Sequence, residues 1–130
     1  MFNYKRRIFS YECDIYGHLN NAEYLKLFEE ARSEALTEIG YSLSKLKNLD
    51  IALYITNANV DFIKEIGLDS QVIIHSKMTK VSRVLFYWYQ KIVNENGNIC
   101  SKVEISGAFV RDGKPFRVSQ NIIETFAKFV

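Results

Sequence analysis

The chain has few of the residues that build disulfide frameworks or metal sites. Only two of its 130 residues are cysteines, Cys13 and Cys100, and they lie far apart in the sequence. Two such cysteines give neither the paired spacing of a metal site nor the set that a small disulfide-stapled protein needs. We therefore expect a protein of a reducing compartment, the cytoplasm, without a metal site.

Long apolar runs are also missing. No stretch approaches the ~20 apolar residues that a helix needs to span a bilayer. The basic residues near the N-terminus are not followed by the apolar core of a signal peptide. We expect no signal peptide, no membrane-spanning segment and no membrane partner.

A large net charge of either sign is absent as well. The chain carries 17 Lys and Arg residues against 15 Asp and Glu residues, a formal net charge of +2. No basic cluster with interleaved aromatic residues suits a nucleic-acid groove or single strand, so no nucleic-acid partner is expected. The short basic run Lys5, Arg6 and Arg7 is interpreted as solvated charge.

Aromatic residues, by contrast, are abundant. Eight Tyr, nine Phe and one Trp make up 14% of a chain whose hydrophobic fraction, 48%, is that of an ordinary globular protein. Aromatic side chains favour β-structure and large packed surfaces. The length suits one domain over residues 1–130, and no linker or repeat divides it.

One long helical pattern covers residues 21–39. Asn20 is a good N-cap for this helix, and Gly40 stands where a helix stop is expected. Apolar residues recur at helical spacing and make one face, formed by Tyr24, Phe28, Ala31, Ala35, Leu36 and Ile39. The opposite stripe is polar throughout, so we expect the helix to lie across a sheet.

The sheet is supplied by segments rich in alternating apolar residues. These segments are residues 2–11, 51–63, 71–80, 83–94 and 99–111. A bend or bulge is expected near Asn57, and Asn96-Gly97 is the strongest hairpin signal. Residues 41–50 are expected as a loop, and residues 119–130 as a short terminal helix.

The order of these elements is strand, long helix, then four meandering strands. It predicts an α+β fold in which a curved antiparallel sheet wraps one long central helix, with a short C-terminal helix. One helix cannot cover such a sheet completely. The apolar surface that remains predicts a homodimer or a dimer of dimers.

A polar turn precedes the long helix. Asp14 is a lone carboxylate, and Gly17, His18, Asn20 and Asn21 follow it. The first amides of a helix have no partner inside it and the macrodipole is positive there, so a helix start is a ready oxyanion site. We expect Asp14 beside that positive end. The stretch can supply an acid or base together with an electrophilic pocket.

The polar turn and the helix start contain a string of the form D-x-x-G-H-x-N-N-x-x-Y. Its residues are Asp14, Gly17, His18, Asn20, Asn21 and Tyr24. The string and the order of elements resemble the hotdog-fold acyl thioesterases, in the branch of 4-hydroxybenzoyl-CoA thioesterase and the acyl-ACP thioesterases. The resemblance implies a hotdog fold and hydrolysis of acyl-CoA or acyl-ACP thioesters at a dimer interface, without a metal or an organic cofactor.

The resemblance also implies roles by position. Asp14 would be the essential carboxylate, as a nucleophile or as a general base for water. Backbone amides around Asn20 to Ala22 would polarise the thioester carbonyl. His18 and Asn21 would orient water or substrate.

The substrate-binding region implied by the resemblance extends beyond the polar turn. Tyr24 would line the acyl pocket, and Ser82 and Arg83 resemble the region that meets the pantetheine arm or the CoA phosphates. Many relatives carry a proline and a Gly-Asp pair before the third strand. Here residues 62–70 read FIKEIGLDS, so the path of the substrate at this turn stays open.

Less specific interpretations stay open for several of these residues. Asp14 alone is a common turn residue, and Asn20 is more typical of a helix cap than of a ligand. His18 can simply hydrogen-bond within the turn, and His75 has no visible partner, which favours a structural role. Cys13 has no base placed beside it, so a cysteine nucleophile is not favoured.

Related chemistries fit the sequence less well. Hotdog hydratases use a D-x-N-P-x-H string, whereas Asp14 and His18 are one residue closer and no proline intervenes. Other thioesterases use a helix glutamate, but Glu23, Glu29 and Glu30 fall off the apolar face and are interpreted as solvated. A non-catalytic module that binds acyl thioesters and a structural subunit of a larger assembly are the alternatives. The polar constellation favours hydrolysis.

Overall fold

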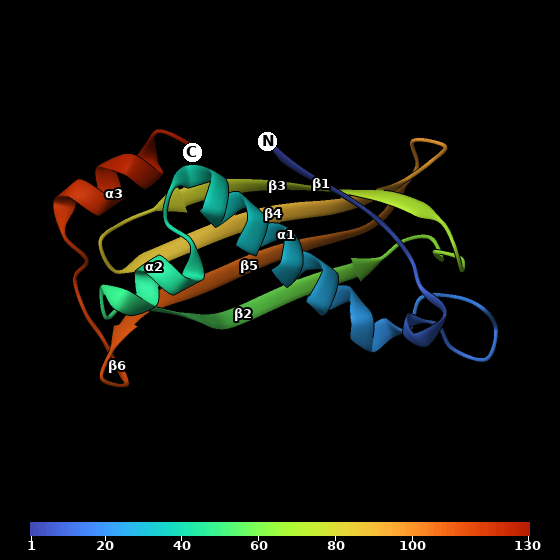
Figure 1. Ribbon diagram of the computed structural model, residues 1–130, viewed down its shortest axis with the longest axis horizontal. Helices are drawn as coiled ribbons and strands as arrows, with labels where there is room; N and C mark the ends of the chain where they lie inside the picture. The colour runs from blue at the N-terminus through green and yellow to red at the C-terminus, as the bar shows by residue number, and fades with distance from the viewer.

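A long helix lying across one face of a six-stranded sheet dominates the computed structural model, which describes residues 1–130 (Figure 1). The strands are β1 (Phe2–Arg7), β2 (Ala52–Phe62), β3 (Gln71–Val81), β4 (Leu85–Asn94), β5 (Ile99–Arg111) and β6 (Lys114–Pro115). The helices are α1 (Tyr24–Ile39), α2 (Leu43–Asn48) and α3 (Gln120–Ala127), with 3-10 turns η1 (Ser10–Glu12) and η2 (Asn21–Glu23). The predicted hotdog architecture, a curved antiparallel sheet around one helix with a short C-terminal helix, is confirmed.

The central helix begins and ends as its sequence predicts. The Asn20 side chain accepts a hydrogen bond from the Ala22 amide at 3.0 Å, and the first turn, η2, is 3-10. Gly40 ends the helix in the left-handed region with φ 99°, where a residue with a Cβ is strained. The buried face is the predicted one with one addition, and consists of Tyr24, Leu27, Phe28, Ala31, Ala35, Leu36 and Ile39.

The strand order is β1-β3-β4-β5-β2, and every pair is antiparallel. Antiparallel pairing is confirmed, but the expected meander is wrong for β2. This strand pairs with β5 and lies at the edge of the sheet, so β2 and β3 are not neighbours. Residues 63–70 cross the end of the sheet instead, anchored by Ile66, which is 2% exposed.

Two local expectations have different outcomes. The register of β2 against β5 shifts between Ile55 and Asn57, so the predicted bulge is confirmed. The predicted loop over residues 41–50 is wrong, because α2 occupies most of it. The Ser42 side chain caps α2 by accepting from the Lys45 amide, and buried Leu46 fixes the helix to the core. No helix has both the length and the apolar character needed to cross a membrane.

The core is closed by aromatic rings that pack against a glycine in β5. Phe86 of β4 and Phe109 of β5 are both about 1% exposed, and their ring centroids lie 5.3 Å apart. A Cβ added at Gly107 would collide with the Phe86 ring and would lie 2.6 Å from the Tyr54 carbonyl oxygen of β2. The absence of a side chain at Gly107 therefore lets the ring lie against the strand.

Gly107→Ala is expected to destabilise the protein by about 1–3 kcal/mol, because the buried Phe86 ring has to move off the strand. Urea unfolding followed by circular dichroism measures the change. Gly67→Ala is the matched control, since its added Cβ would meet only the Ser70 Oγ, at 3.6 Å. Equal stabilities of the two variants would contradict the packing argument.

Candidate active site

Asp14 lies in a tight hairpin-like loop that its own carboxylate helps to build. The Asp14 amide donates to the His18 carbonyl at 2.8 Å, and Gly17 turns the chain with φ 74°. Asp14 Oδ1 accepts hydrogen bonds from the Tyr16 amide at 2.9 Å and the His18 amide at 3.2 Å. Oδ2 accepts none from the protein. One oxygen therefore fixes the carboxylate while the other stays free for chemistry.

The loop is also fastened to the segment that crosses the end of the sheet. The Leu19 amide donates to the Ile66 carbonyl at 2.7 Å, and the Leu68 amide donates to the Gly17 carbonyl at 2.9 Å. His18 and Gly67 form a β-bridge. The segment that the sequence marks as unusual, residues 62–70, thus forms one wall of the site.

A pocket of about 240 Å³ opens between this loop, the start of α1 and the end of β2. Its lining residues are Asp14, His18, Leu19, Asn21, Tyr24, Phe62, Ile63, Lys64 and Glu65. Tyr24 and Phe62 meet edge-to-face at 4.9 Å between centroids. Burial raises the pKa of Tyr24 to about 12, so its hydroxyl stays neutral and serves as a wall rather than as a base.

Two charged residues of the pocket were not foreseen as functional. His18 Nδ1 lies 3.5 Å from Glu65 Oε2, so the ring faces Glu65, and only the His18 backbone contacts the Asp14 carboxylate. Lys64 adds a cation to the same wall. The only signal in the sequence was that residues 62–70 lack the proline and Gly-Asp pair of many relatives.

The helix-start amides are less available than their sequence positions suggest. The Asn20 amide donates to the Glu12 carbonyl at 2.9 Å, and the Ala22 amide donates to the Asn20 side chain. The amide of Asn21 is the first of η2 and has no partner within the helix. Among the three candidate amides, Asn21 is therefore the one free to face a carbonyl oxygen in the pocket.

Ser82 and Arg83 lie at the other end of the sheet. They occupy the β3–β4 turn, whereas the Asp14 loop packs near the start of β3, and β3 spans 11 residues. At ~3.3 Å per residue, roughly 35 Å separates the two ends. Ser82 Oγ accepts from the Leu85 amide, and Arg83 Nε donates to the Val118 carbonyl at 2.7 Å. Within one chain they do not join the Asp14 pocket.

Two other candidate side chains, Cys13 and His75, have structural surroundings. Partial burial and the Asp14 carboxylate raise the pKa of the Cys13 thiol, which disfavours the thiolate that a nucleophile needs. His75 Nδ1 lies 2.6 Å from Asn3 Oδ1, across the β1–β3 pair. Nowhere do three His, Cys, Asp or Glu side chains gather closely enough to hold a metal ion.

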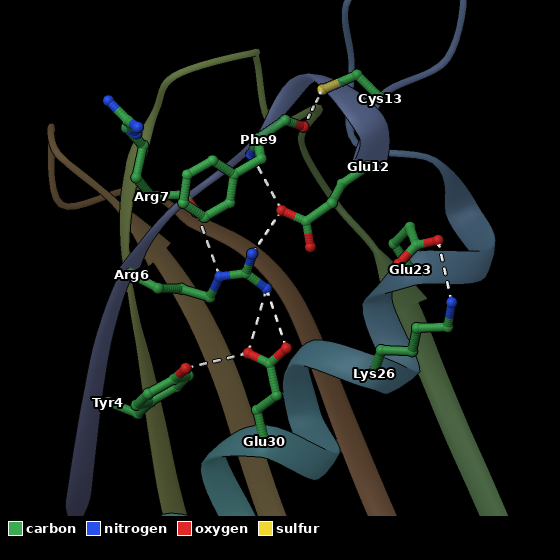
Figure 2. Close-up of polar contacts among 9 residues, drawn as sticks. All are labelled: Tyr4, Arg6, Arg7, Phe9, Glu12, Cys13, Glu23, Lys26 and Glu30. Atoms are coloured by element: carbon green, nitrogen blue, oxygen red, sulfur yellow. Dashed lines mark hydrogen bonds and ion pairs between the residues drawn. The ribbon is translucent and has the colours of Figure 1, made fainter.

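A buried ion cluster joins β1, the turn before Asp14 and α1 (Figure 2). The Arg6 guanidinium contacts the Glu12 carboxylate and lies 3.2 Å from Glu30, and the Arg6 and Glu12 side chains are only 9% and 4% exposed. Glu12 Oε1 also accepts from the Phe9 amide, and the Tyr4 hydroxyl donates to Glu30. The interpretation of Arg6 as solvated charge is therefore wrong, whereas the Glu30 side chain, 42% exposed, pairs with Arg6 and still meets solvent.

Comparison with known proteins covers most of the chain. Residues 10–126, which hold the Asp14 loop, α1 and β2 to β6, match the thioesterase-like superfamily. A protein of Aquifex aeolicus provisionally named an esterase is 28% identical over 123 residues, 95% of each chain. The acyl-CoA thioester hydrolase YbgC of Escherichia coli is 23% identical over 105 residues, 81% of this chain and 78% of that protein. A crystal structure from Aquifex aeolicus superposes with a TM-score of 0.91 at 26% identity, covering 97% of this chain and 99% of that chain.

Arg6→Met is expected to cost about 3–5 kcal/mol of unfolding free energy, because it leaves the buried Glu12 carboxylate without its counter-charge. Urea unfolding measures the loss. The double variant Arg6→Met with Glu12→Gln should recover part of it, since Gln still accepts from the Phe9 amide and carries no charge. Arg7→Met is the neighbouring control and should change stability by about 0.5 kcal/mol or less. A loss below about 1 kcal/mol for Arg6→Met would contradict a buried cluster.

Proposed function

Because the chain belongs to the thioesterase-like superfamily, we propose that it hydrolyses acyl-CoA thioesters with Asp14 as the essential carboxylate. One observation carries this proposal. The Asp14 carboxylate, with Oδ1 held by two amides and Oδ2 free, lines the same pocket as the start of α1. A thioester carbonyl between them would meet a base or nucleophile on one side and a positive helix end on the other.

The chemistry follows from these positions. Asp14 Oδ2 takes a proton from a water molecule, whose oxygen attacks the thioester carbon. The carbonyl oxygen becomes negative beside the Asn21 amide and the start of α1, which stabilise it. Collapse of the intermediate breaks the C–S bond, and the proton passes to the leaving thiolate, giving a carboxylic acid and free CoA. Direct attack by Oδ2 is the alternative route: it would break the C–S bond, expel CoA thiolate and form an acyl anhydride on Asp14, which water would then hydrolyse to the carboxylic acid and free Asp14.

The remaining pocket residues have supporting roles in this proposal. The His18 side chain, held by Glu65, orients the attacking water or the substrate, and Tyr24 forms an apolar wall for the acyl group. Lys64 places a positive charge where an anionic carrier approaches, which suits the phosphates of CoA.

The complete site is proposed to need a second copy of the chain. β2 is an edge strand of 11 residues with exposed apolar side chains such as Tyr54 and Phe62, 53% and 55% exposed. Such an edge is a template for pairing with another strand. Two-fold pairing of β2 edges reverses one subunit, so the far end of the partner's sheet comes beside the Asp14 loop. Ser82 and Arg83 of the partner subunit then reach the carrier bound at this pocket.

Asp14→Asn is expected to lower kcat for acyl-CoA hydrolysis at least ~100-fold, the range of a lost general base. The asparagine Oδ1 still accepts from the Tyr16 and His18 amides, so the loop should keep its shape. Release of free thiol from a panel of acyl-CoA esters measures the rate. Asp112→Asn, in an exposed turn far from the pocket, is the matched control. Equal turnover by Asp14→Asn would remove Asp14 from the mechanism, and acyl-CoA binding without turnover by the wild type would favour a binding module.

Lysine at both Asn57 and Asn59 is expected to weaken the dimer at least ~10-fold, because each copy's β2 edge would meet the same charges on its partner. Sedimentation velocity over a concentration series measures the association, and activity should fall with the dimer fraction. Asn48→Lys with Asn121→Lys adds the same charge on exposed helices and is the control. An unchanged dimer in the β2 variant would place the interface elsewhere.

A further inference from the structure

A second pocket lies farther along α1, in the seam between this helix and β2. Its walls are largely apolar, with Leu36 from α1 and Leu53 and Ile55 from β2, and Phe86 and Trp88 also line it. Its volume is about 70 Å³, about two water molecules at ~30 Å³ each, and enough for a small polar head group. This pocket contains one cationic side chain, Arg32.

Arg32 is held in place by a buried polar chain. Arg32 Nη1 donates to Gln90 Oε1 at 2.8 Å, and Gln90 itself has no exposed surface. Gln90 Nε2 donates to the Phe28 carbonyl at 2.9 Å and to Ser76 Oγ at 2.8 Å. These bonds fix the guanidinium beside the α1 turn at Phe28, one turn before the Arg32 Cα. This position is expected, because helical side chains point toward the N-terminus of their helix.

The guanidinium has no counter-charge within ion-pair distance, although the Glu29 carboxylate acts on it electrostatically at longer range. Arg32 forms no ion pair within 4.0 Å and no hydrogen bond other than the one from Nη1. Every fully buried side-chain nitrogen and oxygen has a partner, so the unbonded Nε and Nη2 of Arg32 keep some exposed surface. Burial lowers the pKa of Arg32, yet arginine stays charged in proteins. Glu29 lines the same pocket on its exposed side without reaching Arg32.

We propose that Arg32 binds a carboxylate at the far end of the acyl group, which makes ω-carboxyacyl thioesters the preferred substrates. This inference rests on the proposed thioester hydrolysis. The Nε and Nη2 edge of a guanidinium matches the two oxygens of a carboxylate, and such bidentate pairs are among the strongest hydrogen bonds in proteins. The apolar walls strengthen the pair, because they lower the local dielectric.

The spacing of the two pockets sets the length of such a substrate. From Asn21 to the turn at Phe28, α1 and η2 advance about 10 Å at ~1.5 Å per residue. An extended chain gains about 1.2 Å per bond, so roughly eight bonds separate the thioester carbon from the distal carboxyl carbon. Acyl groups of diacids with about six to ten carbons, joined to CoA as a thioester through one carboxyl group, fit this span.

The strand side of the seam between the two pockets is formed by β2. Leu53 and Ile55 line the second pocket, and Phe62 lines the first. Alternation along β2, with the bulge at Asn57, puts Ala58 and Val60 on the face between them. The acyl chain of the proposed substrate would run along these two side chains from the Asp14 end to the Arg32 end of the seam.

The experiment compares suberoyl-CoA with octanoyl-CoA, which differ only in the distal carboxylate. The ratio of kcat/KM for suberoyl-CoA to kcat/KM for octanoyl-CoA is expected to exceed one in the wild type. It should fall at least ~10-fold in Arg32→Met, because a charge-assisted hydrogen bond is lost. Arg117→Met, which removes an exposed arginine outside both pockets, is the control and should keep the wild-type ratio.

A second variant tests whether charge in this pocket controls binding of the distal carboxylate, and it leaves the buried hydrogen bonds of Gln90 intact. Glu29→Gln removes the like charge at the pocket rim, so the ratio should rise, and this exposed helix position tolerates the change. It keeps the inference testable even where Arg32→Met does not fold. A ratio that falls in Glu29→Gln would contradict the inference.

The outcomes separate the inference from the proposed function. A wild type that hydrolyses octanoyl-CoA with a ratio of one or less would overturn carboxylate recognition and leave hydrolysis intact. The same conclusion follows if Arg32→Met keeps the ratio but weakens the dimer, since Arg32 would then pair with the partner subunit. Failure to hydrolyse any acyl-CoA would overturn the proposed function itself.

Discussion

The geometry of the Asp14 site depends on the buried ion pairs of Arg6. One guanidinium on β1 pairs with buried Glu12, directly before the Asp14 loop, and with Glu30 on α1, whose side chain is 42% exposed. Charges removed from water hold one another strongly and tolerate little displacement, because an unpaired buried charge is costly. The Asp14 loop and the helix are therefore both held by the Arg6 guanidinium, and the Asp14 carboxylate keeps its place relative to the start of α1.

Features set by neighbouring residues could be predicted from the sequence. Helical periodicity, the Asn20 cap and the bulge near Asn57 are each determined by a short segment of sequence, and the structure has all three. Features set by distant partners could not. The sequence around Arg6 gives no sign that Glu30 will neutralise it, and nothing in the segment 63–70 shows that it crosses the end of the sheet. The Asp14 pocket was found because its motif is local, whereas Lys64 and Glu65 come from that crossing segment.

Much of the D-x-x-G-H-x-N-N-x-x-Y string turns out to shape the backbone. Gly17 turns the loop, the His18 amide holds Asp14 Oδ1, and Asn20 caps the helix start. The parts of the string that we propose to meet a substrate are Asp14 Oδ2, the Asn21 amide and the Tyr24 side chain. A motif of this kind is specific because it builds a loop that holds one carboxylate against one helix end, not because each of its side chains reacts.

The pairing of β1 with β3 has a consequence for how the protein acquires its site. Whereas β3–β4 and β4–β5 join consecutive strands, Phe2 lies opposite Ser76 and β2 pairs with β5, so two of the four long strand pairings join residues that are far apart in the chain. Contacts of this kind slow folding, because a long segment has to be ordered before they form. During synthesis α1 can coil early, but Arg6 has no strand to dock against until β3 has left the ribosome. The Asp14 loop thus becomes ordered late, when more than half of the nascent chain is already outside.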